Sequence, residues 1–305
     1  MALATFSELF RRVRETKGGR RVAVVAADDA HTLEAVALAL EEGVVTPILI
    51  GNAGWIGAWL AKHGIDAGAV RVIDAEKPLD AATRAVALVR AGEADVLMKG
   101  RIETAALMKV VLDRASELRT ERIMSHLAVL EVPTYHKLLA VTDVALNLNP
   151  DLEQKRRILA NAVAALAAMG IDHPKVAVMA AAEEINPKLA ESVDGAELKR
   201  LNQAGEIDGC TVEGPISYDL AIDREAVAIK RYHSPVAADA DLMLVPNLVA
   251  GNLMIKALMF SAGAKFAGII VGAKVPIVVA SRSSPAADKH RSILLAAACS
   301  EPAHG

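Results

Sequence analysis

The sequence predicts an α/β protein in which helices cover a largely parallel sheet. Hydrophobic residues make up 53% of the 305 residues and aromatic residues only 3%. The apolar content is mostly Ala, Val, Leu and Ile, which suits helices packed on buried parallel strands. Short apolar runs also alternate with segments of helical periodicity. A chain of this length forms two domains more often than one.

The first part of the chain shows the alternation most clearly. Val-rich or Ile-rich runs predict strands, and apolar residues spaced three and four apart predict helices. Regular alternation of the two is typical of a parallel sheet wound on both faces. The expected strands are 21–27, 46–50, 70–73 and 96–98, and the expected helices are 6–13, 33–40, 81–89 and one that ends near 111.

The pattern changes near residue 120, where two apolar runs follow each other closely. Residues 122–130 and 138–146 are separated only by 131–137, a connection too short to hold a crossover helix. An antiparallel hairpin is therefore expected, and we place a domain junction here.

The rest of the chain returns to alternation. Asn149-Pro150-Asp151 starts a long helix, and Gly170 marks its end. The other expected helices are 194–202, 217–230, one that ends near 261, and 284–298. The expected strands are 175–181, 209–213, 241–245, 266–271 and 276–279.

Charge, cysteine content and motifs argue against several classes of function. The net charge of −3 gives no support for a nucleic-acid surface. Cys210 and Cys299 lack metal-type spacing, so reduced thiols in a cytoplasmic protein are expected. No signal peptide is recognisable, and no apolar run approaches the ~18 residues of a membrane span. P-loop, dinucleotide-binding, zinc-protease and nucleophile-elbow motifs are also missing from the sequence.

Two strand-to-helix corners carry residues suited to an anion. In 277–288 a strand ends at Ser281-Arg282, Ser284 and Pro285 begin a helix, and Asp288 falls in its first turn. In 96–101 a buried strand ends at Lys99-Gly100-Arg101. Ligands of open α/β sheets bind at such carboxyl ends of strands. Taken alone, the corner at Lys99 is explained somewhat better by a solvated loop. Asp288 is also compatible with a carboxylate that complements the helix dipole, and Ser281 and Arg282 with a loop hydroxyl and a surface cation.

Two further corners lie between these. Ser234 precedes a strand that ends at Pro246-Asn247, and Gly251 and Asn252 follow near a helix N-terminus, where free N–H groups suit a phosphate. The segment 213–219, with Ser217 and Asp219, is explained better by ordinary turn chemistry. Four such corners on one scaffold favour a shared phosphate-handling cleft.

At these residues the chain resembles the phosphate acetyltransferase and phosphate butyryltransferase family. The segments 234–237 and 240–256 match the family's S-P-V-A and A-D…P-(D/N)-x-x-A-G-N-x-x-x-K pattern, and 281–288 matches its S-R-x(5)-D ending. Ser125-His126, Thr142-Asp143 and Asn247 follow the butyryltransferase branch more closely than the acetyltransferase branch. The resemblance covers essentially the whole chain.

The resemblance implies reversible, metal-free transfer of a short acyl group, butyryl or acetyl, between CoA and phosphate. No cofactor is bound permanently, and CoA is a substrate. Asp288 would take the thiol proton, Ser281 would stabilise developing charge, and Arg282 would hold the phosphate. The implied binding residues are Ser234, Asn247, Gly251, Asn252, Lys99, Gly100, Ser125 and His126. His126 is equally compatible with a packed core histidine.

The resemblance also implies two doubly wound α/β domains with an interdomain cleft, as in isocitrate and isopropylmalate dehydrogenases. Residues 1–130 with 271–305 would form the domain that carries the C-terminal motif. Residues 131–270 would form a second domain for dimerisation and substrate binding, and a homodimer is expected. Two other functions stay open: a metal- and NAD(P)-dependent β-decarboxylating dehydrogenase, and a non-catalytic CoA or acyl-phosphate binding protein.

Overall fold

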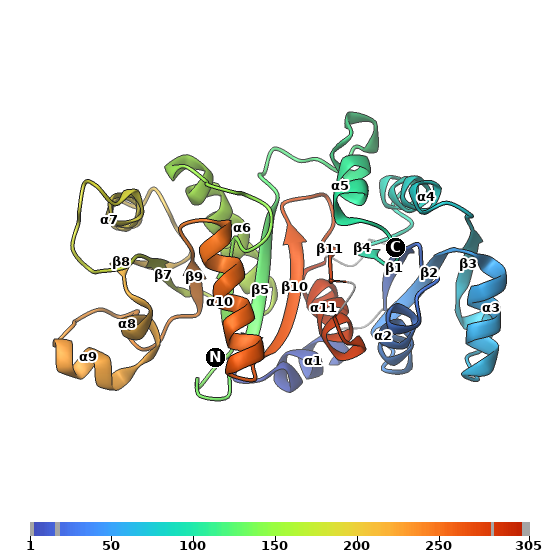
Figure 1. Ribbon diagram of the computed structural model, residues 1–305, viewed down its shortest axis with the longest axis horizontal. Coiled ribbons are helices and arrows are strands. Elements are labelled where there is room, and N and C mark those ends of the chain that lie inside the picture. Colours follow the sequence, from blue (N-terminus) through green and yellow to red (C-terminus); the bar gives the residue numbers. More distant parts are fainter. Residues whose placement is uncertain (1–2, 16–18, 282–283, 301–305) are drawn as a thin grey trace. The chain divides into compact units, whose positions relative to one another are not determined.

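The computed structural model describes residues 3–15, 19–281 and 284–300, and the chain forms two compact units. The terminal unit comprises Ser7–Arg122 with Ala267–Gly305, and the central unit comprises Ile123–Phe266 with Met1–Phe6. Both are α/β (Figure 1). Each is described by itself below.

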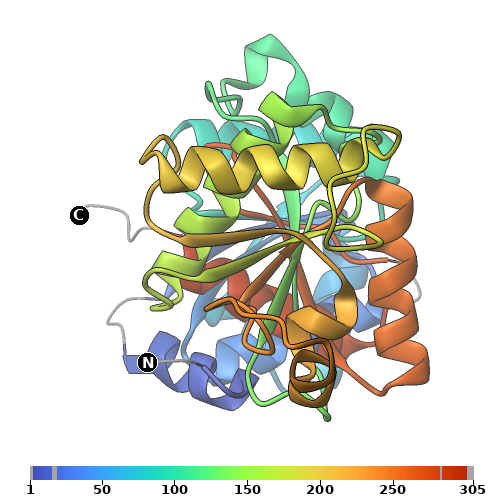
Figure 2. The ribbon, with the colours of Figure 1, turned by 90° about the vertical axis from the view of Figure 1, so that its left-hand side faces the viewer.

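The terminal unit is a doubly wound sheet with strand order β3-β2-β1-β4-β11-β10. All neighbours pair in parallel except β11 with β10. Figures 1 and 2 show α4 and α5 on one side of these strands and α2 and α11 on the other. The strands are β1 (Arg20–Val25), β2 (Val45–Gly51), β3 (Arg71–Asp74), β4 (Val96–Lys99), β10 (Lys265–Val271) and β11 (Ile277–Val278). The helices are α1 (Phe6–Glu15), α2 (Ala30–Glu41), α3 (Ala53–Lys62), η1 (Ala67–Ala69), α4 (Pro78–Arg90), α5 (Thr104–Leu112), η2 (Arg114–Ser116) and α11 (Ala286–Cys299).

The central unit has strand order β5-β6-β9-β7-β8, in which only β5 runs antiparallel to its neighbour. In Figures 1 and 2, α7 lies on one side of these strands and α8 and α9 on the other. The strands are β5 (Ser125–Glu131), β6 (Leu139–Thr142), β7 (Lys175–Met179), β8 (Thr211–Ile216) and β9 (Leu242–Leu244). The helices are α6 (Leu152–Ala168), α7 (Ala190–Gln203), α8 (Tyr218–Ile222), α9 (Arg224–Lys230) and α10 (Leu248–Ser261).

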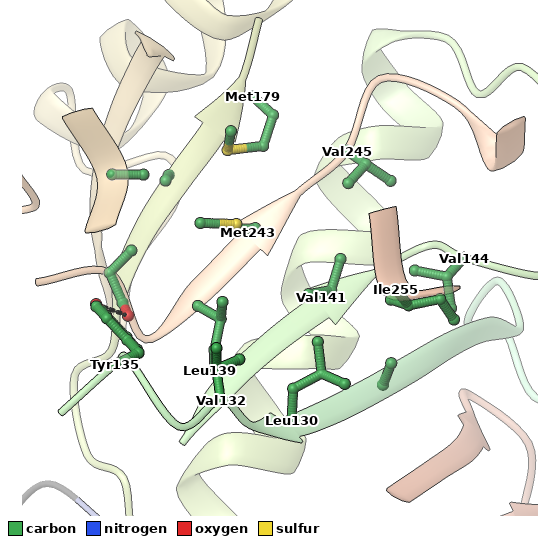
Figure 3. Close-up of a cluster of buried hydrophobic side chains, with 14 of the residues drawn as sticks. Leu130, Val132, Tyr135, Leu139, Val141, Val144, Met179, Met243, Val245 and Ile255 are labelled. Atoms are coloured by element: carbon green, nitrogen blue, oxygen red, sulfur yellow. Dashed lines mark hydrogen bonds between the residues drawn. The ribbon is translucent and has the colours of Figure 1, made fainter. Parts of the chain in front are cut away.

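The core of the central unit is built on strands that are buried along almost their whole length. Leu139 and Val141 of β6 and Met243 of β9 are buried in one cluster, which α10 closes with Ile255 (Figure 3). Burying an aliphatic side chain of this size stabilises a fold by about 1.5–3 kcal/mol. The other residues of these two strands are buried as well, as expected for strands of a sheet covered on both faces.

The expected hairpin is present, but its second strand is shorter than predicted. Ala128 pairs with Val141 and Leu130 with Leu139. β6 ends at Thr142 because the Asp143 carboxylate accepts hydrogen bonds from the backbone N–H groups of Ala145 (2.9 Å) and Leu146 (3.0 Å). The ladder therefore gives way to an Asx turn.

The observed division of the chain differs from the expected one at 130/131 and 270/271. The chain passes between units at Arg122/Ile123 and at Phe266/Ala267. β5 belongs with the central unit because it pairs with β6. The first residues join the same unit, since the Leu138 N–H donates to the Leu3 carbonyl at 2.8 Å.

Sequence periodicity also missed α3. Gly54 and Gly57 interrupt its pattern, but Asn52 caps the helix by accepting a hydrogen bond from the Trp55 N–H at 2.8 Å. A good N-cap contributes about 1 kcal/mol, comparable to the cost of one interior glycine.

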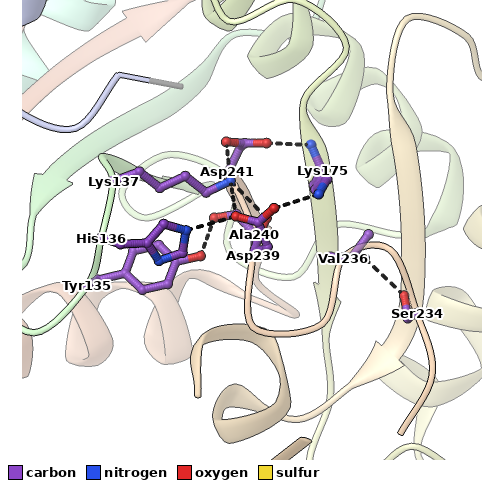
Figure 4. A network of polar contacts seen from close by, with 9 residues as sticks. All are labelled: Tyr135, His136, Lys137, Lys175, Ser234, Val236, Asp239, Ala240 and Asp241. Carbon is purple, nitrogen blue, oxygen red and sulfur yellow. Dashed lines mark hydrogen bonds and ion pairs between the residues drawn. The ribbon is translucent and has the colours of Figure 1, made fainter. Parts of the chain in front are cut away.

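A polar network holds the amino-terminal ends of β6, β7 and β9 together (Figure 4). Lys137, only 4% exposed, forms ion pairs with Asp239 (2.9 Å) and Asp241 (2.6 Å). Asp239 also pairs with Lys175 (2.5 Å) and His136 (2.9 Å). Burial raises the pKa of Asp239, but hydrogen bonds from Lys175, Lys137 and His136 outweigh it and hold that pKa well below its usual range.

We predict that Asp239→Asn destabilises the protein by about 1–2 kcal/mol at pH 7, since one charge-assisted partner of a buried lysine is lost. The folded-state pKa of Asp239 lies below that of the unfolded chain, which is near ~3.9. Its stabilisation is therefore present above that pH and is lost as the pH falls toward the folded-state pKa.

The measurement is urea unfolding of the wild type and the variant between pH 7 and pH 3. Glu153→Gln, which breaks an exposed ion pair with Arg156 in α6, serves as the control and is expected to change little. A difference between Asp239→Asn and wild type that grows toward low pH would contradict the account.

Candidate active site

A polar pocket of about 380 Å³ opens in the terminal unit at the carboxyl ends of its strands. Three segments converge there because β4 pairs in parallel with both β1 and β11. This is the edge of an open α/β sheet at which ligands bind. The described residues that line it are Asp29, Lys99, Gly100, Arg101, Ala280, Ser281 and Lys289.

Lys99 and Gly100 form the end of β4 in this pocket. The Lys99 side chain is buried, and its ammonium donates to the carbonyls of Gly100 (3.3 Å) and Ala280 (3.4 Å). A Cβ on Gly100 would stand 2.4 Å from the carbonyl oxygen of Ala26. Only glycine allows this approach, so the residue type at position 100 fixes the floor of the pocket.

The opposite wall contains an ion pair between α2 and α11. The Lys289 ammonium lies 3.0 Å from a carboxylate oxygen of Asp29 and 3.2 Å from the Thr32 hydroxyl. Asp29 also caps α2 by accepting from the Thr32 N–H at 2.9 Å. Burial raises the pKa of Asp29, but hydrogen bonds from Thr32 and Lys289 outweigh it and lower that pKa below its usual value. Asp29 is therefore a carboxylate at neutral pH.

Of the C-terminal motif Ser281-Arg282…Asp288, only Ser281 is among the described residues that line this pocket. Ser281 lines it, directly after the end of β11. Arg282 lies outside the described residues. Asp288 stands in the first turn of α11, is 6% exposed and forms an ion pair with Arg291 one turn on. Asp288 is not among the described residues that line the pocket.

In the central unit, Ser125 and His126 lie at the start of β5. The Ser125 hydroxyl accepts from the Asn161 amide at 3.2 Å and is fully buried. His126 is also buried, and its Nδ1 has no hydrogen-bond partner among the described residues. Burial lowers the pKa of His126, and the nearby Asp143 carboxylate opposes this only partly. His126 is thus a neutral imidazole beside a carboxylate at pH 7.

Three other candidates gather at the carboxyl ends of β6 and β9. The Asn247 side chain caps α10 by accepting from the Ala250 N–H at 2.9 Å. A Cβ on Gly251 would lie 3.0 Å from the Asp143 carbonyl, so glycine lets α10 pack against this loop. The Asn252 amide lies 3.5 Å from the Val144 carbonyl. The N-terminus of α10, the loop that follows β6 and His126 therefore lie at one edge of the central unit.

Ser234 has a different environment. It is half-buried in the loop that leads to the amino-terminal end of β9, and its hydroxyl accepts from the Val236 N–H at 3.1 Å (Figure 4). The Ser217 hydroxyl donates to Glu183, and Lys230 joins Glu183 (3.3 Å) to Asp219 (3.1 Å). The chain between β8 and α9 is thus held by local polar contacts, in keeping with turn chemistry.

Within the described ranges, no group of three or more His, Cys, Asp or Glu side chains is arranged to hold a metal ion. A separate search of the described helices finds none long and apolar enough to cross a bilayer.

The terminal unit is thus an α/β unit with a lysine-lined pocket at the ends of its strands. The family model of phosphate acetyl/butaryl transferases matches residues 75–297, a span that contains β4, α10 and most of α11. The chain belongs to this family of phosphate acyltransferases, whose members use CoA as a substrate.

Curated relatives of both branches are similarly close in sequence. A phosphate butyryltransferase of Clostridium acetobutylicum is 39% identical over 295 residues, which cover 97% of this chain and 98% of the relative. A phosphate acetyltransferase of Rhizobium meliloti is 40% identical over 269 residues, covering 88% of this chain and 85% of the relative.

Solved structures confirm the predicted fold class. A branched-chain phosphotransacylase from Enterococcus faecalis superposes with a TM-score of 0.82 at 33% identity, covering 92% of this chain and 98% of that one. A 4-hydroxythreonine-4-phosphate dehydrogenase from Burkholderia phymatum shares the fold alone, with a TM-score of 0.57 at 15% identity over 94% of this chain and 100% of that one.

Sequence analysis missed Asp29, Thr32, Lys289 and Arg291. A usable pattern was present for Asp29, because it follows a buried strand and precedes a helix, as an N-cap does. Lys289 and Arg291 follow Asp288 closely, but only the packing of α11 on α2 shows that Lys289 reaches the pocket.

Proposed function

We propose that this protein transfers a short-chain acyl group, preferentially butyryl, reversibly between CoA and inorganic phosphate. The observation that carries this proposal is the cationic pocket of the terminal unit. Its described lining holds Lys99, Arg101 and Lys289 against the single carboxylate of Asp29. Fixed cations and a hydroxyl at the strand ends suit a doubly charged phosphoryl group.

The chemical step is direct attack of the CoA thiolate on the carbonyl carbon of the acyl phosphate. The C–S bond forms, and the bond between the carbonyl carbon and the oxygen that bridges to phosphorus breaks. Phosphate leaves with the electron pair of that bond. A thiol with a pKa near ~8.5 needs only modest help to ionise at neutral pH. Ser281 and, by resemblance, Arg282 stabilise the charge on the departing phosphate.

Asp288 is proposed as the group that accepts the thiol proton. It lies at the N-terminal turn of α11, seven residues after Ser281 and next to Lys289, which lines the pocket. Arg291 contacts the same carboxylate and fixes its orientation. A general base must be held in one direction to receive a proton efficiently, and this ion pair supplies that restraint.

The remaining candidates are proposed to bind CoA or phosphate from the central unit: Ser125, His126, Ser234, Asn247, Gly251 and Asn252. The exposed end of α10 and the neutral His126 are compatible with that role. The butyryl preference rests on Ser125-His126, Thr142-Asp143 and Asn247, which resemble the butyryltransferase branch more than the acetyltransferase branch.

The proposed activity is tested with acyl-CoAs from acetyl to valeryl and phosphate, with free thiol as the readout. Butyryl-CoA is expected to give the highest kcat/KM, with propionyl-CoA about 10- to 200-fold lower, since one methylene is worth ~1–3 kcal/mol. Omitting phosphate is the control and should abolish thiol release. No thiol release with any member of the series would refute the proposal.

For Asp288→Asn we predict a fall in kcat of about 10²- to 10⁴-fold, the usual contribution of a general base. The measurement is the rate of thiol release, together with the circular dichroism spectrum, which is expected to be unchanged. Asp80→Asn is a matched control, because Asp80 is also a first-turn carboxylate, in α4, paired with an arginine of its own helix. Near wild-type kcat in Asp288→Asn would remove Asp288 from this role.

A homodimer is proposed to form through α10. This helix exposes Val249, Leu253 and Phe260 along one face, with exposed fractions of 63%, 64% and 83%. Exposed apolar residues in such a row are unusual on the surface of a monomer.

Leu253→Glu is accordingly expected to shift the protein from dimer to monomer in sedimentation velocity experiments. Ile229→Glu is the control, since Ile229 of α9 is equally exposed (73%) but lies on another helix. A wild-type monomer, or a Leu253→Glu dimer of unchanged affinity, would contradict the proposal.

A further inference from the structure

Lys289 is a buried cation on the wall of the pocket. Its side chain is 5% exposed, and its ammonium contacts Asp29 and Thr32, both from the start of α2. An ammonium carries three donors, and these two contacts use two of them. Since Lys289 also lines the pocket, the remaining donor is available to a bound ligand.

The charge balance of the pocket favours an anion beside this lysine. Lys99 and Lys289 are both buried, and Arg101 stands at the mouth with an exposed side chain. Asp29 is the single carboxylate among the described lining residues. Arg101 forms an ion pair with Asp28, which is not among the described lining residues (3.5 Å). The two buried lysines therefore face one lining carboxylate, and this excess of positive charge favours a bound anion.

A comparison with Lys137 shows that burial of a lysine alone does not produce this excess. Lys137 is also 4% exposed, but two carboxylates, Asp239 and Asp241, lie within 2.9 Å of its ammonium. Lys137 is therefore fully neutralised by its own protein. Lys289 has one carboxylate partner among the described residues, and that carboxylate is partly exposed.

We propose that Lys289 binds the phosphate that accepts or releases the acyl group, and that Asp29 and Thr32 are positioning residues for its ammonium. This inference rests on the proposed function. The Asp29 carboxylate holds the ammonium at the wall while the pocket is empty and competes with phosphate for it. The two members of the ion pair therefore act on phosphate affinity in opposite directions.

These opposite effects of Lys289 and Asp29 on phosphate affinity distinguish a binding role from a structural one. If the ion pair merely joined α2 to α11, loss of either partner would lower stability and leave the KM for phosphate unchanged. The same phosphate chemistry is present in CoA, whose own phosphates are the alternative ligand. If Lys289 binds a phosphate of CoA, the KM for butyryl-CoA would change and the KM for phosphate would not.

The experiment measures the KM values for phosphate and for butyryl-CoA in wild type, Lys289→Met and Asp29→Asn. Lys289→Met keeps the volume and removes the charge, and the KM for phosphate is expected to rise about 10- to 100-fold, the loss of one charged hydrogen bond. Asp29→Asn retains an N-cap, and the KM for phosphate is expected to fall roughly two- to fivefold as competition is relieved. The KM for butyryl-CoA should stay within about twofold in both.

Two further variants serve as controls. Thr32→Val removes a hydroxyl but no charge, so its KM for phosphate should change less than that of Lys289→Met. Asp239→Asn breaks an ion pair of the other buried lysine and should leave both KM values unchanged. Shifts of the same sign in Asp29→Asn and Lys289→Met, or a shift confined to butyryl-CoA, would overturn the inference.

Calorimetric titration of the wild type with inorganic phosphate separates this inference from the proposed function. Phosphate binding that Lys289→Met abolishes would support the role of Lys289 even if no acyl-CoA reacts. Turnover in the wild type with equal phosphate affinity and KM in Lys289→Met would support the function and refute the role. If Lys289→Met does not fold, a rise in the KM for phosphate in Asp29→Asn is sufficient to refute it.

Discussion

Parallel pairing of β4 with both β1 and β11 is the constraint on which the pocket depends. Val24 and Val278 pair with Met98 from its two sides, so the three strands end at one edge. The segments that follow these strands are distant in sequence: 26–29, 100–101 and 279–289. Backbone pairing therefore brings Asp29, Lys99 and Ser281 into one pocket.

Close backbone approach then sets the shape of this edge. The N–H groups of Gly100 and Arg101 donate to the carbonyls of Val25 (2.8 Å) and Ala26 (2.7 Å), which extends the β1–β4 ladder into the loops. A side chain at position 100 would collide with the same carbonyls. The glycine thus allows the loops to stay paired, and Lys99 is held where its ammonium reaches the Ala280 carbonyl. The lysine and the serine corner are in this way parts of one hydrogen-bonded unit.

Periodicity and corner chemistry were enough to predict the fold class, the hairpin and part of the pocket. Lys99, Gly100 and Ser281 were expected at strand ends, and strand pairing places them together because sequential strands in α/β sheets have few alternative orders. Asp29 and Lys289 were not predicted, since their meeting depends on how α11 packs against α2, a contact between residues 260 positions apart. α3 was missed because its two glycines weaken the propensity on which the prediction relied, while the Asn52 cap compensates. The observed boundary between the units lies before β5 and not after it, because β5 pairs with β6 of the central unit.

The two buried lysines of this chain show how one chemical group can serve stability or binding. A buried ammonium is tolerated only if nearby groups offset its desolvation. Around Lys137 two carboxylates from a single loop do so, and the network holds the starts of three strands. Around Lys289 one shared carboxylate and a hydroxyl do so incompletely, in a pocket that already contains Lys99. Adding a phosphoryl group there would complete the neutralisation that Asp239 and Asp241 give Lys137 permanently. On this proposal, the positive charge of Lys99 and Lys289 would contribute binding energy for an anionic substrate.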